Sequence, residues 1–440
     1  MAKQQRILNQ SLEPSDRSAN QTNKSSPDKN IVTALLVIIV LFFLFPLGRY
    51  LTRHNRFFGQ QNYIPYSASS APTQAISNQT NSPNIISVKE NDNLPIQTTG
   101  FIIYFKLIPV KGGRPRETTL DGDIWKADPT GANPQKIYAH HLVANEHPQW
   151  DISPDNTTLV TRDDSGNLVS VNISTSKSMS LGLFGQAPQY SPDGKKILYF
   201  GHGPSYSSSN GLYVINSDGS NNKRVYPPPS STTNEPDEYY TPQVWSPDSQ
   251  RVVFEASQNG FSVIKIANVD TGAVETILDE TILKSFNFNY NYLHTPLWGS
   301  STTNQIAFVM ERAESVPTLD TKLGLYDVSS KKVIAADYIL PHWSRGSSYS
   351  PDGKKIALPP LNPSLNDEKS YDLALINEQG KTLNVFNMGS GIGGTCGWSA
   401  DGRYLLIAGG SLLMIFNPAK QSYRTIVEGV FGTETNCWSK

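Results

Sequence analysis

One short phrase recurs through the sequence from about residue 147 onward, and it limits the folds that this chain can adopt. It reads PQWDISPD from Pro148, PQYSPDGKKI from Pro188, PQVWSPDSQRV from Pro242, SSYSPDGKKI from Ser347 and GWSADGRYLLI from Gly397. A second strand-like run follows each copy, such as NLVSVN from Asn167 or GLYVIN from Gly211, and a third run ends each unit. The repeat length of roughly 38 to 55 residues is in the range of β-propeller blades.

The chemistry of the phrase predicts four strands per unit. In Ser-Pro-Asp-Gly, Ser, Pro, Asp and Gly each match the preference of their position in a type I turn. The turn lies between two apolar runs, as a hairpin turn should. Asp155, Asp193, Asp248, Asp352 and Asp401 therefore read as turn residues with a structural role.

The two ends of the repeat region complement one another. FIIYF from Phe101, DIWKAD from Asp123 and PQKIYA from Pro134 form a unit without a first strand, whereas ETNCWSK from Glu434 is a first strand alone. We expect the last strand to complete the first blade, which leaves only short, protected edges. The fold class is thus all-β: seven four-stranded blades closed by the C-terminal strand. An open solenoid of small sheets is the alternative.

Composition narrows the function. The 37 basic and 38 acidic residues nearly balance, which argues against a nucleic-acid-binding protein. With Cys396 and Cys437 as the two cysteines, a disulfide-dense scaffold and a four-cysteine zinc site are excluded. These two cysteines lie in predicted inner strands of adjacent blades and form a candidate disulfide, which strict bond geometry limits. We expect no metal and no cofactor.

An apolar run precedes the repeat. Residues 31–45 read IVTALLVIIVLFFLF, near the short limit for a membrane span. A cleaved signal peptide is the alternative, but the run is followed by RYLTR from Arg49 with no small-x-small cleavage site. We predict a disordered cytoplasmic tail at 1–30, a transmembrane signal-anchor helix at 31–48, a flexible Ser/Asn/Gln/Pro-rich stalk at 49–99 and the propeller at 100–440.

These repeat phrases resemble the TolB-like, PD-type relatives of WD-repeat propellers, over about residues 100–440. The resemblance implies four-stranded blades around a channel, usually in an exported or periplasmic bacterial protein. It places the tail inside and the propeller outside the cytoplasm, where counts of flanking charge alone decide little. The unit TPLWGSST from Thr295 departs from the pattern because it lacks the Pro-Asp turn. The order tail, helix, propeller is also that of the dipeptidyl peptidase family, but no G-x-S-x-G elbow is present, so that activity is not carried over.

Strand direction predicts where a site lies. Tight turns share one rim of an up-and-down blade, and nearly all long insertions fall on the opposite rim, where binding residues commonly sit. That rim carries aromatic residues that favour recognition or, alternatively, pack the loops onto the blades. The candidate binding residues are Tyr206, Tyr239, Tyr240, Phe286, Phe288, Tyr290, Tyr292 and Trp343.

The expected function is a non-catalytic, membrane-anchored module that binds a protein or cell-envelope ligand on the long-loop face. A lactonase-like propeller hydrolase with its site at the channel mouth, and a structural envelope protein, remain alternatives. Fold alone does not choose among them.

Overall fold

The computed structural model describes residues 85–108, 119–143, 149–201, 210–227, 243–258, 261–300, 303–312, 320–340, 346–359, 372–388, 394–409, 411–430 and 437–439. The chain divides into two compact units, residues 1–73 and 74–440, and every described residue belongs to the second. The tail at 1–30 and the anchor at 31–48 lie outside the described residues. Within the described ranges, no helix has the length and apolar character needed to cross a membrane.

The described strands form six sheets, and neighbouring strands of the repeat are antiparallel. A three-stranded sheet contains β3 (Ile102–Leu107), β4 (Thr119–Ala127) and β5 (Gln135–Val143). A seven-stranded sheet contains β6 (Asp151–Ile152), β7 (Thr158–Arg162), β8 (Asn167–Asn172), β9 (Ser178–Tyr190), β10 (Lys196–Gly201), β11 (Gly211–Asn216) and β12 (Lys223–Tyr226).

The later sheets follow the repeat one by one. Two four-stranded sheets contain β13 (Gln243–Trp245), β14 (Arg251–Gln258), β15 (Phe261–Asn268), β16 (Val274–Leu278), and then β17 (Tyr292–Trp298), β18 (Gln305–Arg312), β19 (Asp320–Asp327), β20 (Lys332–Leu340). The last repeats give β21 (Ser348–Tyr349), β22 (Lys355–Leu358), β23 (Asp372–Asn377), β24 (Thr382–Asn387), and β25 (Gly394–Trp398), β26 (Leu405–Gly409), β27 (Leu412–Asn417), β28 (Ser422–Glu428). Helix α2 (Glu280–Ser285) joins β16 to β17.

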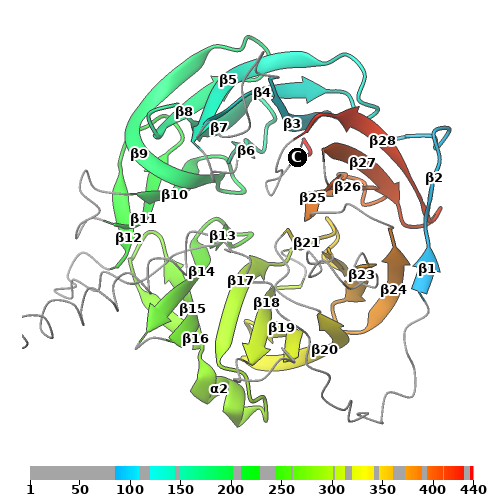
Figure 1. The fold of residues 1–440 in the computed structure, drawn as a ribbon. Coiled ribbons are helices and arrows are strands. Elements are labelled where there is room, and N and C mark those ends of the chain that lie inside the picture. Colours follow the sequence, from blue (N-terminus) through cyan, green and yellow to red (C-terminus); the bar gives the residue numbers. More distant parts are fainter. Residues whose placement is uncertain are drawn as a thin grey trace, which may run out of the picture. The chain divides into compact units, whose positions relative to one another are not determined.

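Residue choice explains the sheets. The second strand of each unit is a continuous apolar run, such as LLIAG in β26, and all five residues of that strand are buried. A strand that is packed on both faces has a continuous apolar sequence of this kind, because neither face is exposed to water. In Figure 1 the sheets follow one another in chain order around a common centre, and β6, β13, β17, β21 and β25 lie nearest to it.

The hydrophobic core is divided among successive sheets. Each cluster joins neighbours in chain order, from β6–β9 with β9–β12 through to β21–β24 with β25–β28. The remaining cluster joins residues of both ends of the repeat region, including Ile102 in β3, Leu406 in β26 and Trp438. Buried apolar surface therefore links every sheet to the next and the last sheet to the first.

Residues 437–439 lie between β3 and β25. The amide of Ile103 donates to the carbonyl of Cys437 at 2.8 Å, and the amide of Ser439 donates to that of Phe101 at 2.9 Å. On the other side the amide of Cys437 donates to the carbonyl of Cys396 at 3.0 Å. Figure 1 shows the C-terminal end near the centre, beside these strands.

Indole groups make one bond repeatedly between neighbouring inner strands. Trp245 Nε1 donates to the carbonyl of Gln189 at 3.2 Å, and Trp398 Nε1 donates to that of Ser348 at 3.3 Å. Trp438 Nε1 donates to the carbonyl of Gly397 at 3.0 Å. Residue 438 is thus bonded to its neighbour in the same way as the tryptophans of two complete units.

Strand β9 differs from the expected pattern. The sequence predicts a last strand in one unit and a first strand in the next, but Ser178–Tyr190 is one continuous strand. Its first part pairs with β8 and its second part with β10. Positive φ angles at Gly182 (69°) and Ala187 (51°) accompany these changes of register, and irregularities of this kind bend a strand without ending it.

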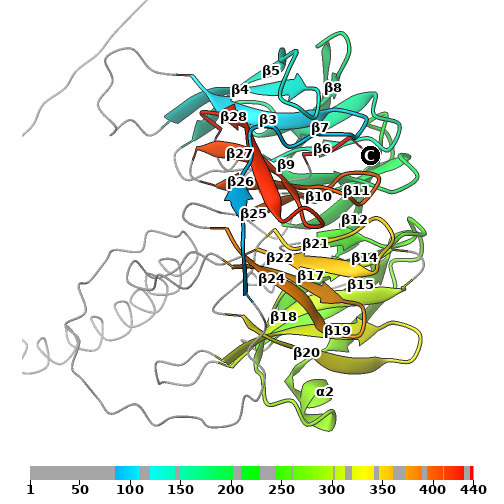
Figure 2. The ribbon, with the colours of Figure 1, turned by 90° about the vertical axis from the view of Figure 1, so that its right-hand side faces the viewer.

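The segment before the repeat also differs from expectation. We predicted a flexible stalk as far as residue 99, yet β1 (Ile85–Ser87) pairs in parallel with β24, and β2 (Lys89–Glu90) pairs in parallel with β28. Leu94 is only 2% exposed. The outer strands offer unpaired backbone groups, and the polar segment satisfies them. Figures 1 and 2 show β1 and β2 along the outside of these sheets, and we call residues 85–97 the strap.

Candidate functional site

The two ends of the sheets differ in their connections. Because the strands are antiparallel, the turns after each first and third strand lie at one end, which we call the turn end. The connections after each second and fourth strand lie at the opposite end, the loop end. The turn-end connections are short, whereas the long connections belong to the loop end: 108–118, 202–210, 227–242, 313–319 and 359–371.

At the turn end, the serine and the aspartate of each repeat phrase are hydrogen-bonded to one another and to nearby backbone amides. Ser350 Oγ donates to Asp352 Oδ1 at 2.6 Å and accepts from the amide of Lys355 at 3.0 Å. Asp352 Oδ1 accepts from the amide of Lys354 at 3.1 Å. Asp155, Asp193, Asp248 and Asp401 occupy the same position and are bonded in the same way. All five aspartates thus serve the turns.

These bonds change the acidity of the carboxyl groups. The Ser153 hydroxyl, with the amide and hydroxyl of Thr157, lowers the pKa of Asp155 below its ordinary value. The Ser350 hydroxyl likewise lowers the pKa of Asp352. Donors aimed at a carboxylate stabilise its charged form.

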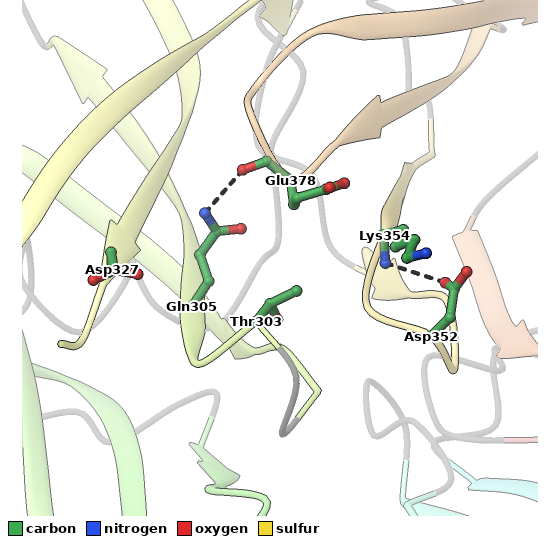
Figure 3. A pocket seen from close by; sticks show the side chains of 6 residues that line it. All are labelled: Thr303, Gln305, Asp327, Asp352, Lys354 and Glu378. Carbon is green, nitrogen blue, oxygen red and sulfur yellow. Dashed lines mark hydrogen bonds between the residues drawn. The ribbon is translucent and has the colours of Figure 1, made fainter. Parts of the chain in front are cut away.

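Thr303, two residues before β18, lines a polar cleft of about 360 Å³ (Figure 3). Gln305 Nε2 donates to the carbonyl of Glu378 at 3.0 Å, and the hydroxyl of Tyr349 donates to Gln305 Oε1 at 3.2 Å. The carboxylates of Asp327, Asp352 and Glu378 outnumber the one ammonium group, that of Lys354. These two bonds satisfy both the nitrogen and the oxygen of the buried Gln305 amide.

The predicted aromatic binding residues fall into two groups. Tyr206, Tyr239, Tyr240 and Trp343 lie outside the described residues. Of the rest, Phe286 and Phe288 pack against the core cluster beneath β17, and Tyr290 is 6% exposed. For these three side chains, the alternative of packing the loop onto the sheets is the one that the structure shows.

Helix α2 positions this aromatic segment. Asp279 caps it, since its carboxylate accepts from the amide of Ile282 at 2.7 Å. Lys284 Nζ lies 2.6 Å from Glu280 Oε1, one turn away. The chain then passes through Asn287 at a φ of 63° and enters β17 at Tyr292. The helix thereby brings Tyr292 and His294 to the loop end.

A polar cluster lies at the loop end between β14 and β17–β18, and we call it the acid–histidine cluster. It consists of Glu255, Ser262, His294 and Glu311. His294 Nδ1 lies 3.0 Å from Glu255 Oε1, and Ser262 Oγ donates to the same oxygen at 3.2 Å. His294 Nε2 lies 3.9 Å from Glu311 Oε2.

This cluster is enclosed and its charges are not balanced. The side chains of His294, Glu255 and Glu311 are 12%, 20% and 10% exposed. The cluster holds two carboxylates and one imidazole, so negative charge is in excess whether or not the ring carries a second proton. The ring of Tyr292 stacks on that of His294, with centroids 6.1 Å apart and planes at 14°. The arrangement suits a cationic group better than an anion.

Reasoning from the sequence missed this cluster. Glu255 follows the apolar run VVF in β14, and Glu311 follows the apolar run FVM in β18, the second strands of two successive units. An acidic residue directly after the apolar run of a second strand is a signal that could have been read. The register of β17, with its bulge between His294 and Leu297, could not have been read from the sequence.

Cys396 and Cys437 are buried, 1% and 0% exposed, and are not joined by a disulfide. Their backbones are directly bonded to one another, as given above, but the structure holds no bond between the sulfur atoms. Among the described residues, no group of three or more His, Cys, Asp and Glu side chains is placed to hold a metal ion.

No family profile and no curated protein matches this chain. Solved structures do resemble it. TolB from Acinetobacter baumannii is 18% identical with a TM-score of 0.42, covering 65% of this chain and 63% of that structure. Hydrazine synthase from Kuenenia stuttgartiensis is 13% identical with a TM-score of 0.46, covering 82% of this chain and 100% of the other. The β-propeller domain of Cps50 (Swd1) from Myceliophteria thermophila is 9% identical with a TM-score of 0.47, covering 74% and 99%.

This chain thus spans less than two thirds of the length of that TolB structure. A second TolB, from Agrobacterium tumefaciens, is 16% identical with a TM-score of 0.41, covering 69% of this chain and 95% of that structure. Two of these structures are thus TolB proteins, and a third is a β-propeller domain.

Proposed function

We propose that the described sheets are the blades of a seven-bladed β-propeller, closed by residues 437–439. The seven-stranded sheet counts as two blades that share β9, and residues 437–439 supply the inner strand that the β3–β5 sheet lacks. Two observations support closure: the core cluster that joins β3 with β26, and the Trp438 indole bond that repeats those of Trp245 and Trp398.

The propeller acts as a non-catalytic binding module for a protein or another ligand of the cell envelope, and it binds at the loop end. The observation that carries this proposal is the contrast between the two ends. The turn end is closed by short turns whose polar groups bond one another, whereas the long connections all emerge at the loop end. Loops on a rigid scaffold are the usual place for recognition.

The module is held at a membrane through residues 31–48, with the propeller outside the cytoplasm. The motivation is the apolar run at 31–45 and the repeat phrases of the exported TolB-like type. Protease added to intact cells should digest the propeller and spare the tail. Protection of the propeller in intact cells, with digestion after lysis, would contradict this orientation.

Partner capture tests the binding end. The combined variant Tyr206→Ser, Tyr239→Ser, Tyr240→Ser and Trp343→Ser changes loop-end connections only. The matched control, Lys195→Ser, Asp218→Ser and Lys420→Ser, changes exposed residues of turn-end connections. Crosslinking in membranes should capture a partner with the native chain and the control, but not with the loop-end variant. Loss in the control alone would place binding at the wrong end.

A second candidate function is hydrolysis of a small ligand at the loop end. The Glu255–His294 contact favours it, because a carboxylate that orients an imidazole is a common general-base arrangement. Purified chain would then hydrolyse nitrophenyl esters or lactones, and His294→Ala would abolish the turnover. Absence of turnover by the native chain removes this candidate.

A further inference from the structure

Two neighbouring buried oxygen atoms at the loop end of β18 and β19 have no hydrogen-bond partner among the described residues. They are Glu311 Oε2 and Thr321 Oγ1. Glu311 and Thr321 are directly opposite one another in β18 and β19, and they are 7% and 0% exposed. A buried carboxylate oxygen without a hydrogen-bond donor is costly, since it has lost its water and gained no hydrogen bond in return. Its presence here points to a ligand that supplies donors.

The surroundings of Glu311 define the charge of that ligand. Glu255 already accepts from His294 Nδ1 and from Ser262, but His294 Nε2 stays 3.9 Å from Glu311 Oε2. That separation is too long for a hydrogen bond. Two carboxylates therefore flank one imidazole, and the outer one lacks a donor. A cation that donates hydrogen bonds would supply the partner that Glu311 Oε2 lacks.

The shape of the cluster favours a planar cation. A guanidinium group has several N–H donors in one plane, so it can bond a carboxylate through two of them and reach a hydroxyl through a third. The rings of Tyr292 and His294 are stacked, and Tyr292 lies directly opposite Glu311 in the paired strands β17 and β18. Guanidinium stacks on such rings, whereas an ammonium group is a compact, strongly hydrated charge.

We propose that the acid–histidine cluster binds the guanidinium group of an arginine side chain of the partner protein, with Glu311 as its principal acceptor. This inference rests on the proposed function, because it names the chemistry of a partner bound at the loop end. Glu255 and His294 hold the site in shape, and Thr321 adds an oxygen opposite Glu311.

A small probe tests the site on the full-length chain in detergent. N-acetyl-L-arginine methylamide, titrated by calorimetry, should bind saturably. Glu311→Gln should weaken this binding about tenfold or more, the size expected for a hydrogen bond to a charged group. Glu428→Gln is the matched control. It removes the same charge from an exposed residue that ends β28, also at the loop end. Equal binding by all three proteins would overturn the proposal.

Stability without the probe gives a second readout. If Glu311 is kept for a ligand, Glu311→Gln should leave the melting temperature unchanged or raise it, because a buried carboxylate oxygen that has no hydrogen bond is replaced by a neutral amide. If Glu311 instead serves as a structural partner of His294, the melting temperature should fall. A lower melting temperature of Glu311→Gln, together with unchanged probe binding, would contradict the assignment of Glu311 as the acceptor of the ligand.

Two further outcomes separate the levels of the proposal. N-acetyl-L-lysine methylamide binding as tightly as the arginine probe would overturn the guanidinium assignment. No saturable binding of the arginine probe, while the loop-end variant still loses its partner, would overturn this inference and leave the proposed function standing. Partner capture that survives the loop-end variant would overturn the proposed function itself.

Discussion

At the level of single residues, serine is the side chain that makes each repeat turn self-sufficient. Ser399 Oγ donates to Asp401 Oδ1 at 2.7 Å and accepts from the amide of Tyr404 at 3.0 Å. Ser399 is 0% exposed, so no water could replace these bonds. A hydroxyl can donate and accept together, which neither alanine nor a carboxylate does. This explains the fixed Ser-x-Asp spacing of the phrase.

The turn aspartates predict how stability depends on pH. The pKa of Asp155 and of Asp352 is lowered in the folded protein, chiefly by the hydroxyls of Ser153 and Ser350. A group whose pKa is lower when folded stabilises the fold above its unfolded pKa, and that contribution is lost as pH falls through the folded value. We expect the melting temperature to fall as pH drops below about 4.

The double variant Asp155→Asn and Asp352→Asn checks this prediction. It should melt lower than the native chain at pH 7 and lose less on acidification, since two of the titrating groups are gone. Melting curves over a pH series measure both effects. An acid loss in the variant as steep as that of the native chain would show that other groups control it.

Trp298 shows what one departure from the repeat costs. Its Nε1 is buried and has no hydrogen-bond partner among the described residues, unlike the indoles of Trp245 and Trp398. The guanidinium of Arg251 instead lies 5.1 Å from the centre of its ring. The residues around the Gly-Ser-Ser-Thr turn thus keep the packing of the tryptophan but not its bond.

At the level of elements, the hairpins could be predicted and the edges could not. A hairpin is local: its turn residues and apolar runs are adjacent in the sequence. The strap is not, because Ile85–Ser87 becomes a strand only beside β24, some 300 residues later. It also belongs to the longer segment 49–99, whose Ser-, Asn-, Gln- and Pro-rich composition is that of a linker. A local sequence pattern gives no information about pairing between strands so far apart in the chain.

The same limit applies to the acid–histidine cluster. Glu255, His294 and Glu311 come from three strands in two sheets, and only tertiary packing brings them together. The aromatic residues were easier to notice but less informative, since Phe286, Phe288 and Tyr290 pack inward. Their spacing alone could not tell a recognition surface from a loop anchored to its sheet.

The strap contributes to stability, and Leu94 tests this. Leu94 is 2% exposed although it lies before the first repeat unit. Leu94→Ala should cost about 2–5 kcal/mol of unfolding free energy, as for other buried leucines. Leu383→Ala is the control, because Leu383 is 44% exposed in β24. Urea denaturation compares the two, and similar midpoints would mean that the strap is dispensable.

At the level of the whole molecule, stability depends on the contacts of residues 437–439. Trp438 is 2% exposed and lies in the core cluster that joins the first and last sheets. Trp438→Ala should cost about 3–5 kcal/mol, while Trp438→Phe keeps a ring and loses the indole bond, for about 1 kcal/mol.

Denaturation of both Trp438 variants checks this ranking. The alanine variant should also expose β3 to proteolysis, because its neighbour is loosened. Wild-type behaviour of Trp438→Ala would contradict a role of this residue in holding the two ends of the repeat region together.

The continuous strand β9 has a consequence for cooperativity. No other described strand continues from one repeat unit into the next. The backbone of Ser178–Tyr190 instead serves two successive units of the seven-stranded sheet. Breaking the hydrogen bonds between β9 and β8 therefore also disturbs the strand with which β10 pairs. Amide protons of β8 and β10 should therefore exchange with solvent at matched rates, as one unit of local unfolding rather than two.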